Sequence, residues 1–343
     1  MKIKLLSIIV LLSLTACNQD QLTETTTAQE VNQNNVFNEK NKSIKRCNFD
    51  EVLNHELENN PKFKAKFDEN EAYLANYLKS KDQESLINRT TQKTLVVKVV
   101  VNNIYTSSPI SMRVIERQIE RLNEGFRGVL RTNARLPRNA NRFNAGDTKI
   151  RFELESVNFR RNQKRFNNVF DLYRRSSGGI NPTAIGNYIN IYVAELIEAQ
   201  NGFESVGAAT QPGDASSVEE DHIFIDNTGF GVNRGNSRFN EGKTLIHEMG
   251  HFLGLFHLPG NAVNSCRFDD AIGDTPNSSS LHFEIPVPGA STTTCGSQDM
   301  YWSFLNNADD SVLYMFTTGQ SKRMRASLES SRGSRRNFLD KSE

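Results

Sequence analysis

Hydrophobic and polar positions repeat with two different periods along the chain, and together these periods predict an α/β fold. Strands are predicted at 95–101, 150–154, 188–193 and 222–225, where β-branched or alternating residues gather. A helix is predicted after Ser111, which can cap it, and a last helix near 321–331. The apolar face of the first helix is formed by Val114, Ile115, Ile119, Leu122 and Phe126. This order predicts an α/β enzyme core followed by an irregular second lobe.

The first 16 residues have the composition of a secretory signal peptide. A positive start precedes an apolar run at 5–12, which is too short to span a bilayer. The sequence Leu14, Thr15, Ala16, Cys17 resembles a bacterial lipobox, in which the cysteine is lipidated after cleavage. We therefore expect an exported lipoprotein anchored at Cys17, at the outer membrane or cell surface. The alternative is an ordinary signal peptide with a chance cysteine.

Two further segments precede the first predicted strand. Residues 17–46 are rich in Asn, Gln, Thr and Glu, which predicts a flexible, lipid-anchored tether. Residues 47–92 carry apolar positions at helical spacing between charged residues, which predicts a helical pro-segment. The main domain is then expected at 93–343.

Charge and cysteine content narrow the possible partners and the redox chemistry. The chain has 41 Lys and Arg against 40 Asp and Glu, so its charge gives no argument for a nucleic-acid partner. We expect a monomer that contacts a membrane through its lipid only. If Cys17 carries lipid, an odd number of cysteines remains in an oxidising compartment, which predicts one disulfide and one leftover thiol. Cys266 and Cys295 flank a loop-rich stretch and are the expected pair, which leaves Cys47.

Three of the six histidines fall within eleven residues. On a helix, His247 and His251 lie about 40° apart on one face, one turn from each other. His257 reaches the same ion only if the chain turns sharply, and Gly254 permits that turn because glycine tolerates positive φ. Three neutral histidines leave one tetrahedral position open, which is typical of a catalytic zinc site.

Glu248 follows the first of these histidines directly. In this position its carboxylate can act as general base toward a zinc-activated water that attacks a peptide carbonyl. Unrelated histidines on a core helix are the alternative, but they leave both the third histidine and the Gly254 turn unexplained. We therefore expect one zinc ion, bound by His247, His251 and His257.

This motif resembles the metzincin clan of zinc metalloproteases, and the chain more specifically resembles the pappalysin branch from about Leu95 to Met324. The motifs that carry the resemblance, in order, are Leu122-Asn123-x-x-Phe126, 188–193, 207–212, the zinc motif 247–257, 274–276, 295–297 and 316–320. The resemblance implies two lobes. The upper lobe holds a twisted, mostly parallel sheet with a backing helix and the active-site helix, and the irregular lower lobe ends in a helix.

The resemblance also implies substrate contacts. Gly207, Ala208 and Ala209 would belong to an edge strand that pairs with substrate backbone, although an ordinary buried strand explains them equally well. Asp310 would lie at the base of the pocket for the residue after the cut bond and select Arg or Lys. A solvated turn formed by Asp309 and Asp310 is the alternative.

Three other expectations come from the same resemblance. Asp270 and Thr275 are candidate calcium ligands, with an acidic turn capped by Asp274 as the alternative. Cys47 could occupy the open zinc position as a latency switch, with a free surface thiol as the alternative. Where the family has a turn methionine, this chain has Leu305, which conserves volume and leaves the fold expectation intact. This departure bears on catalytic efficiency.

The sequence thus predicts a zinc endopeptidase that acts on proteins or peptides. The alternative is an inactive, zinc-binding surface lipoprotein on the same scaffold.

Overall fold

The computed structural model describes residues 45–84, 92–166, 169–196, 205–210, 220–232, 238–260, 265–286, 292–332 and 335–340. The chain divides into two units, Met1–Ser43 and Ile44–Glu343, and the fold below is that of the second unit. The predicted signal peptide, Cys17 and the tether up to residue 44 lie outside the described residues. None of the described helices combines the length and apolar character that membrane crossing requires.

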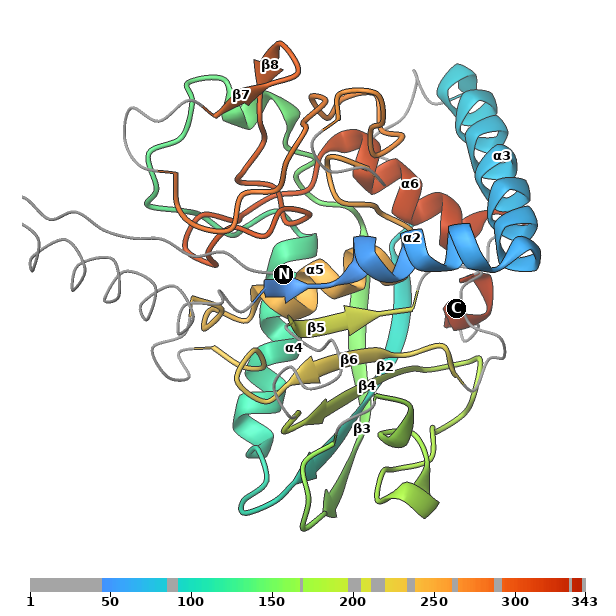
Figure 1. The fold of residues 1–343 in the computed structure, drawn as a ribbon, viewed down its shortest axis with the longest axis vertical. Coiled ribbons are helices and arrows are strands. Elements are labelled where there is room, and N and C mark those ends of the chain that lie inside the picture. Colours follow the sequence, from blue (N-terminus) through green and yellow to red (C-terminus); the bar gives the residue numbers. More distant parts are fainter. Residues whose placement is uncertain are drawn as a thin grey trace, which may run out of the picture. The chain divides into compact units, whose positions relative to one another are not determined.

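A six-stranded, mostly parallel sheet forms the centre of the fold (Figure 1), as the sequence predicts. Its strand order is β1, β5, β6, β4, β2, β3. Neighbouring strands are parallel except for β5 and β6, which are antiparallel. The strands are β1 Lys45–Cys47, β2 Leu95–Tyr105, β3 Ile150–Arg161, β4 Ile189–Ala194, β5 Ser205–Ala209 and β6 Ile223–Asp226.

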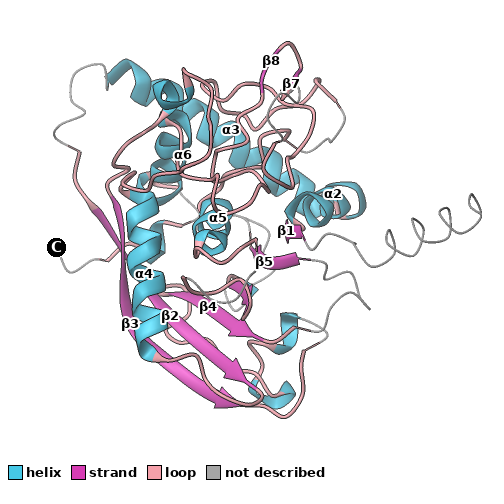
Figure 2. Cartoon of the chain, turned by 90° about the vertical axis from the view of Figure 1, so that its left-hand side faces the viewer, coloured by secondary structure: helices cyan, strands magenta, loops and turns pink. Residues whose placement is uncertain are grey.

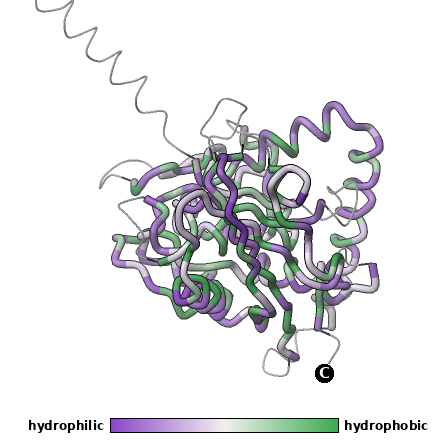
Figure 3. The backbone as a smooth tube through the Cα atoms, turned by 90° about the horizontal axis from the view of Figure 1, so that it is seen from below, coloured by the Kyte–Doolittle hydropathy of each residue, from purple (hydrophilic) through white to green (hydrophobic). Residues whose placement is uncertain are grey.

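The main hydrophobic core lies between this sheet and helix α4, Met112–Phe126, which runs along the sheet beside helix α5, Lys243–Phe252 (Figure 2). Four of the five apolar positions predicted for α4 are buried, and Val114 is half-buried. Hydrophobic and hydrophilic positions are interleaved along the backbone, as expected when each element buries one side (Figure 3). Ser111 precedes α4 as predicted, but its side chain makes no capping hydrogen bond.

The segment before β2 folds into two helices, α2 Phe49–Asn59 and α3 Pro61–Glu84. A separate apolar cluster joins this segment to Phe256, and it consists of Cys47, Phe49, Leu53, Phe63 and Phe256, with Leu57 and Phe67 packed against it. Helix α3 lies beside helix α6, Thr318–Glu329 (Figure 1), where Arg323 pairs with Glu71 at 2.6 Å. The helical pattern predicted for this segment is therefore present, and the helices dock on the core.

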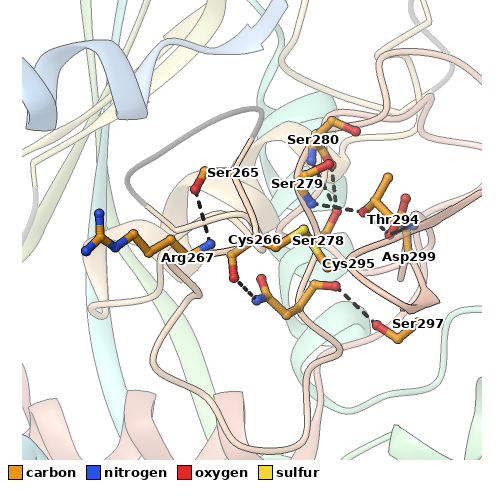
Figure 4. Close-up of a disulfide and its surroundings, with 11 residues drawn as sticks. Ser265, Cys266, Arg267, Ser278, Ser279, Ser280, Thr294, Cys295, Ser297 and Asp299 are labelled. Carbon is orange, nitrogen blue, oxygen red and sulfur yellow. Dashed lines mark hydrogen bonds between the residues drawn. A yellow bond between two sulfur atoms is a disulfide. The ribbon is translucent and has the colours of Figure 1, made fainter.

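Between α5 and α6 the chain is irregular, as expected for the lower lobe. Among its described residues the only paired strands are β7 Thr293–Thr294 and β8 Ser297–Gln298. The predicted disulfide is present, with the Cα atoms of Cys266 and Cys295 5.3 Å apart (Figure 4). Outside this lobe, short 3-10 helices lie at Ala140–Phe143, Val169–Asp171, Arg175–Ser177 and Arg336–Phe338.

Several element boundaries differ from the sequence prediction, most of all the start of α6 and the ends of β2 and β3. Helix α6 begins at Thr318 because Thr317 and Gln320 form a reciprocal capping box, three residues before the predicted start. Strand β2 continues to Tyr105, beyond its predicted end at residue 101, and strand β3 continues to Arg161, beyond its predicted end at residue 154. Because β3 is an edge strand whose later residues are only partly buried, its arginines can reach solvent while their backbone pairs with β2.

Candidate active site

Helix α5 carries two of the three motif histidines and Glu248, and it is buried along its whole length. His247 and His251 lie one helical turn apart and face the same point. The helix ends at Phe252, and Gly254 adopts a φ of 95°, which turns the chain back as expected. His257 then returns to the two helical histidines.

The Nε2 atoms of the three histidines converge. His251 Nε2 lies 3.0 Å from that of His247 and 3.2 Å from that of His257, and the remaining pair is 3.1 Å apart. Nitrogen ligands held about 2.0–2.1 Å from a tetrahedral zinc are separated by roughly 3.3–3.4 Å, so this spacing is close to that of one shared ion.

The opposite ring nitrogen of each histidine faces an oxygen acceptor. His247 Nδ1 donates to the Phe304 carbonyl at 2.6 Å, and His251 Nδ1 donates to the Leu255 carbonyl at 2.8 Å. His257 Nδ1 donates to Asp50 Oδ2 at 2.8 Å. With hydrogen on every Nδ1, the three Nε2 lone pairs face one another, which is unfavourable unless a cation lies among them. The donor set therefore fits zinc.

Burial also favours the neutral form that metal ligation requires. Desolvation lowers the pKa of His247 and of His251 well below the usual value, and the neighbouring imidazoles lower both further. Phe49 of α2 stacks on the His251 ring at 3.9 Å and meets the His257 ring edge-on. This ring excludes water from one side of the cluster.

Glu248 points toward Gly207 of β5 and Cys47 of β1. Its Oε2 accepts a hydrogen bond from Cys47 Sγ at 3.6 Å, and burial raises the pKa of Glu248 to about 8. A Cβ atom added at Gly207 would lie 2.5 Å from Glu248 Oε1, so β5 approaches the carboxylate closely enough to require glycine there.

Cys47 joins the histidine cluster. Its Sγ and one ring nitrogen from each of His247, His251 and His257 all lie within 4.8 Å of one another. Burial and the Glu248 carboxylate raise the pKa of the Cys47 thiol. The alternative of a free surface thiol is wrong for this residue, because Cys47 is buried.

Arg46 fills a pocket beside the cluster, and it is completely buried. Its guanidinium forms an ion pair with Asp310 Oδ1 at 2.8 Å and donates to the Ala308 carbonyl at 2.7 Å and to Thr244 Oγ1 at 3.1 Å. The Phe239 ring lies 4.6 Å from the guanidinium carbon. Asp310 is buried, so the alternative of a solvated turn does not hold for it.

Backbone N–H groups also hold the Asp310 carboxylate in place. Its Oδ2 accepts hydrogen bonds from the backbone N–H of Glu241 at 2.8 Å and of Lys243 at 3.3 Å. Asp309 instead pairs with Arg238. The two neighbouring carboxylates thus have separate partners, and only Asp310 faces Arg46.

Leu305 lies under the active-site helix. A Cβ atom added at Gly250, between the two helical histidines, would lie 3.1 Å from Leu305 Cδ2. Because the preceding carbonyl, that of Phe304, holds His247, this buried turn supports the metal site from below.

The two candidate calcium ligands contact each other. Thr275 Oγ1 donates to Asp270 Oδ1 at 2.6 Å. Asp270 Oδ2 is buried and has no hydrogen-bond partner among the described residues, and desolvation raises the pKa of Asp270 to about 7.

Sequence reasoning missed three residues of the site, namely Arg46, Phe49 and Asp50. Arg46 adjoins the cysteine that the sequence singled out, so a basic residue next to a candidate metal ligand was an available signal. Nothing in the sequence pattern marks Asp50 or Phe49, because their roles depend on how α2 docks.

Comparison with known proteins agrees with this geometry. Residues 184–329 match the model of the peptidase M43 family, described as pregnancy-associated plasma protein-A. Mature mirolysin of Tannerella forsythia, solved with a cleaved peptide, has a TM-score of 0.65 and 28% identity, covering 72% of this chain and 96% of that one. These likenesses support a metzincin-like zinc metalloprotease.

Other similar proteins match at lower identity or over a smaller part of the chain. A T. forsythia promirolysin mutant has a TM-score of 0.70 at 24% identity, covering 85% of this chain and 96% of that one, which shows the fold. An extracellular metalloprotease of Arthroderma gypseum is 32% identical over 138 residues, 40% of this chain and 46% of the relative. One of Pyricularia oryzae is 36% identical over 88 residues, 26% and 30% of the two chains. The chain spans less than half the length of these curated relatives.

The close approach of β5 to Glu248 generates a stability prediction. Gly207→Ala should lower the free energy of unfolding by about 1–3 kcal/mol, because the new methyl group overlaps Glu248 and Thr244. Chemical denaturation would measure this. Gly273→Ala is the matched control, since a Cβ there meets nothing within 4 Å. Equal stability of the two variants would contradict the packing argument.

Proposed function

We propose that this chain is a zinc endopeptidase, with His247, His251 and His257 as metal ligands and Glu248 as general base. One observation carries the proposal. The Nε2 atoms of the three histidines converge to within 3.0–3.2 Å of one another, and the buried Glu248 lies beside them on helix α5. The likeness to mature mirolysin, solved with a cleaved peptide, supports peptide substrates.

Each residue has a defined part in hydrolysis. Zinc supplies a Lewis acid that polarises a peptide carbonyl and acidifies water. Glu248 takes a proton from the attacking water and returns it to the leaving amine. A carboxylate in this position can both accept the water proton and release it to the amine. The outer edge of β5, including Gly207, Ala208 and Ala209, pairs with the substrate backbone.

The proposed cut lies before Arg or Lys. Arg46 supports this preference, because the chain's own guanidinium pairs with Asp310 and lies over Phe239 in a fully buried pocket. A neutral side chain would leave the Asp310 carboxylate buried without its cation, which is costly. The pocket is therefore suited to a basic residue after the cut bond.

The segment Lys45–Cys47 keeps this site latent in our proposal. Cys47 lies where it can act as the fourth metal ligand, Arg46 fills the basic pocket, and β1 occupies the edge of β5. Metal, pocket and edge strand are thus all blocked by three consecutive residues. Helices α2 and α3 follow directly, which supports a pro-segment that includes Lys45 and Arg46, ahead of the expected start at residue 47, and runs to residue 92, with a catalytic domain at 93–343.

The direction of β1 indicates that it lies in the site as a blocking segment and not in the manner of a substrate. Strand β1 is parallel to β5, with Cys47 opposite Gly207. Arg46 precedes Cys47, whereas the basic residue of a substrate would follow the cut bond. A substrate that puts its basic side chain in the same pocket and its carbonyl at the histidines must therefore run the other way, antiparallel to β5.

Export and calcium complete the proposal. Relatives named extracellular metalloproteases support secretion, and we retain Cys17 as the lipid anchor. The buried Oδ2 of Asp270 has no hydrogen-bond partner in the part of the chain that the structure describes, which supports a calcium ion bound by Asp270, with Thr275 beside it.

Glu248→Gln should retain zinc but reduce peptidase activity roughly 100- to 10,000-fold, because the amide cannot carry the proton. Elemental analysis and cleavage of a peptide library measure the two properties. His257→Ala should lose both. Full activity of Glu248→Gln would refute the mechanism, and a Cys47→Ala protein that binds zinc but cleaves nothing would favour the inactive surface lipoprotein.

Cys47→Ala should raise the activity of the uncleaved protein or speed its self-processing, because the thiol no longer blocks the metal. Time courses of intact-mass spectrometry and peptide cleavage would follow this. Val52→Ala, an exposed position on the same helical segment, is the control and should remain latent. Unchanged latency of Cys47→Ala would reject the switch.

Asp310→Ala should weaken the preference for Arg or Lys after the cut about 100-fold or more, since the carboxylate supplies the pairing charge. Mass-spectrometric profiling of library cleavage sites measures it. Asp309→Ala, whose carboxylate pairs with Arg238, should keep the preference. An Asp310→Ala profile still enriched in basic residues would assign the specificity elsewhere.

Calcium should raise the midpoint of thermal unfolding, and Asp270→Asn should abolish this increase because a ligand charge is lost. Differential scanning calorimetry with calcium and with a calcium-selective chelator is the measurement. Asp269→Asn, at the exposed neighbouring position, is the control. A midpoint that does not respond to calcium in the wild type would rule out the ion.

A further inference from the structure

The three histidine ligands are not held in the same way. His247 and His251 donate through Nδ1 to backbone carbonyls of the core, those of Phe304 and Leu255. His257 donates instead to a side chain, that of Asp50, the second residue of α2. The orientation of the third ligand therefore depends on the segment that precedes β2.

Asp50 is buried at this contact. Its exposed fraction is 6%, and its Oδ1 has no hydrogen-bond partner among the described residues. The bond from His257 Nδ1 to Oδ2 is thus the contact that compensates a buried carboxylate. Burying such a charge is costly unless positive charge lies nearby, and a cation on the far side of the His257 ring supplies it.

The neighbouring residue fixes the carboxylate in place. Phe49 stacks on His251 at 3.9 Å and packs edge-on against His257. Because Phe49 and Asp50 are consecutive at the start of α2, the stacked ring sets where the carboxylate lies. Glu58, at an exposed position of the same helix, has no such constraint.

We propose that Asp50 is a positioning residue for the metal: it holds His257 with its hydrogen on Nδ1 and thereby strengthens zinc binding in the precursor. The inference rests on the zinc site proposed above. A carboxylate that accepts from a ligating imidazole fixes its tautomer and ring orientation and makes the coordinating nitrogen a stronger donor. Asp50 does this while Cys47 blocks the site, so one segment both assembles the metal centre and silences it.

Competition with a chromophoric chelator on the full chain tests the proposal. Asp50→Ala should weaken zinc binding roughly 10- to 100-fold, and Asp50→Asn less, because the amide oxygen still accepts the bond but lacks the charge. Glu58→Ala should bind as the wild type does. Nitrogen-15 NMR of the histidines should show the Nδ1–H signal of His257 altered in Asp50→Ala, with those of His247 and His251 retained.

The same zinc titration in a Cys47→Ser protein separates two roles of Asp50, the orientation of His257 and the placement of the Cys47 thiol. If Asp50 acts through His257, Asp50→Ala weakens zinc binding in this background too. If Asp50→Ala does not lower zinc affinity in the Cys47→Ser protein, Asp50 acts only by keeping the thiol in place, which overturns the proposal. Unchanged zinc affinity and NMR signals in Asp50→Ala also overturn it. A wild type that binds no zinc would instead refute the proposed function itself.

Discussion

The convergence of three imidazole nitrogens is the constraint on which the rest of the structure depends. Lone pairs 3.0–3.2 Å apart repel one another, so the fold must hold each ring firmly from behind until a cation balances them. The holding groups come from three distant parts of the chain. They are the turn at Phe304, the carbonyl of Leu255 after the glycine turn, and Asp50 in the first turn of α2.

This requirement explains why the irregular lower lobe must be well packed. Its turn supplies the Phe304 carbonyl and places Leu305 against the helix that bears the histidines. The leucine side chain has fewer rotatable bonds than that of methionine, so Leu305 occupies this space in fewer conformations. The turn can therefore support His247 with Leu305 in place of the turn methionine of the family that the chain resembles.

The sequence predicts the parts of this site that follow from local geometry. Helical periodicity places His247 and His251 on one face, and Gly254 allows the return of His257, because these relations depend on a few consecutive residues. The parallel core strands are also predictable from their β-branched runs. Arg46 and Asp50 are not, because their roles depend on the pairing of β1 with β5 and on the docking of α2, more than 150 residues away in sequence.

In the latent form that we propose, the strand that blocks the site, β1, has only three residues, and the helices that follow it hold its segment to the core through the cluster around Phe256 and the pair of Arg323 with Glu71. Strand and helices act as two linked binding modules, so the helices keep the strand at a high effective concentration. A cut between α3 and β2 leaves the modules joined, and the severed piece remains an inhibitor bound without a covalent link. A cut between β1 and α2 separates the strand from both helices that hold it. The position of the cut therefore sets whether the site is freed at once or only on dilution.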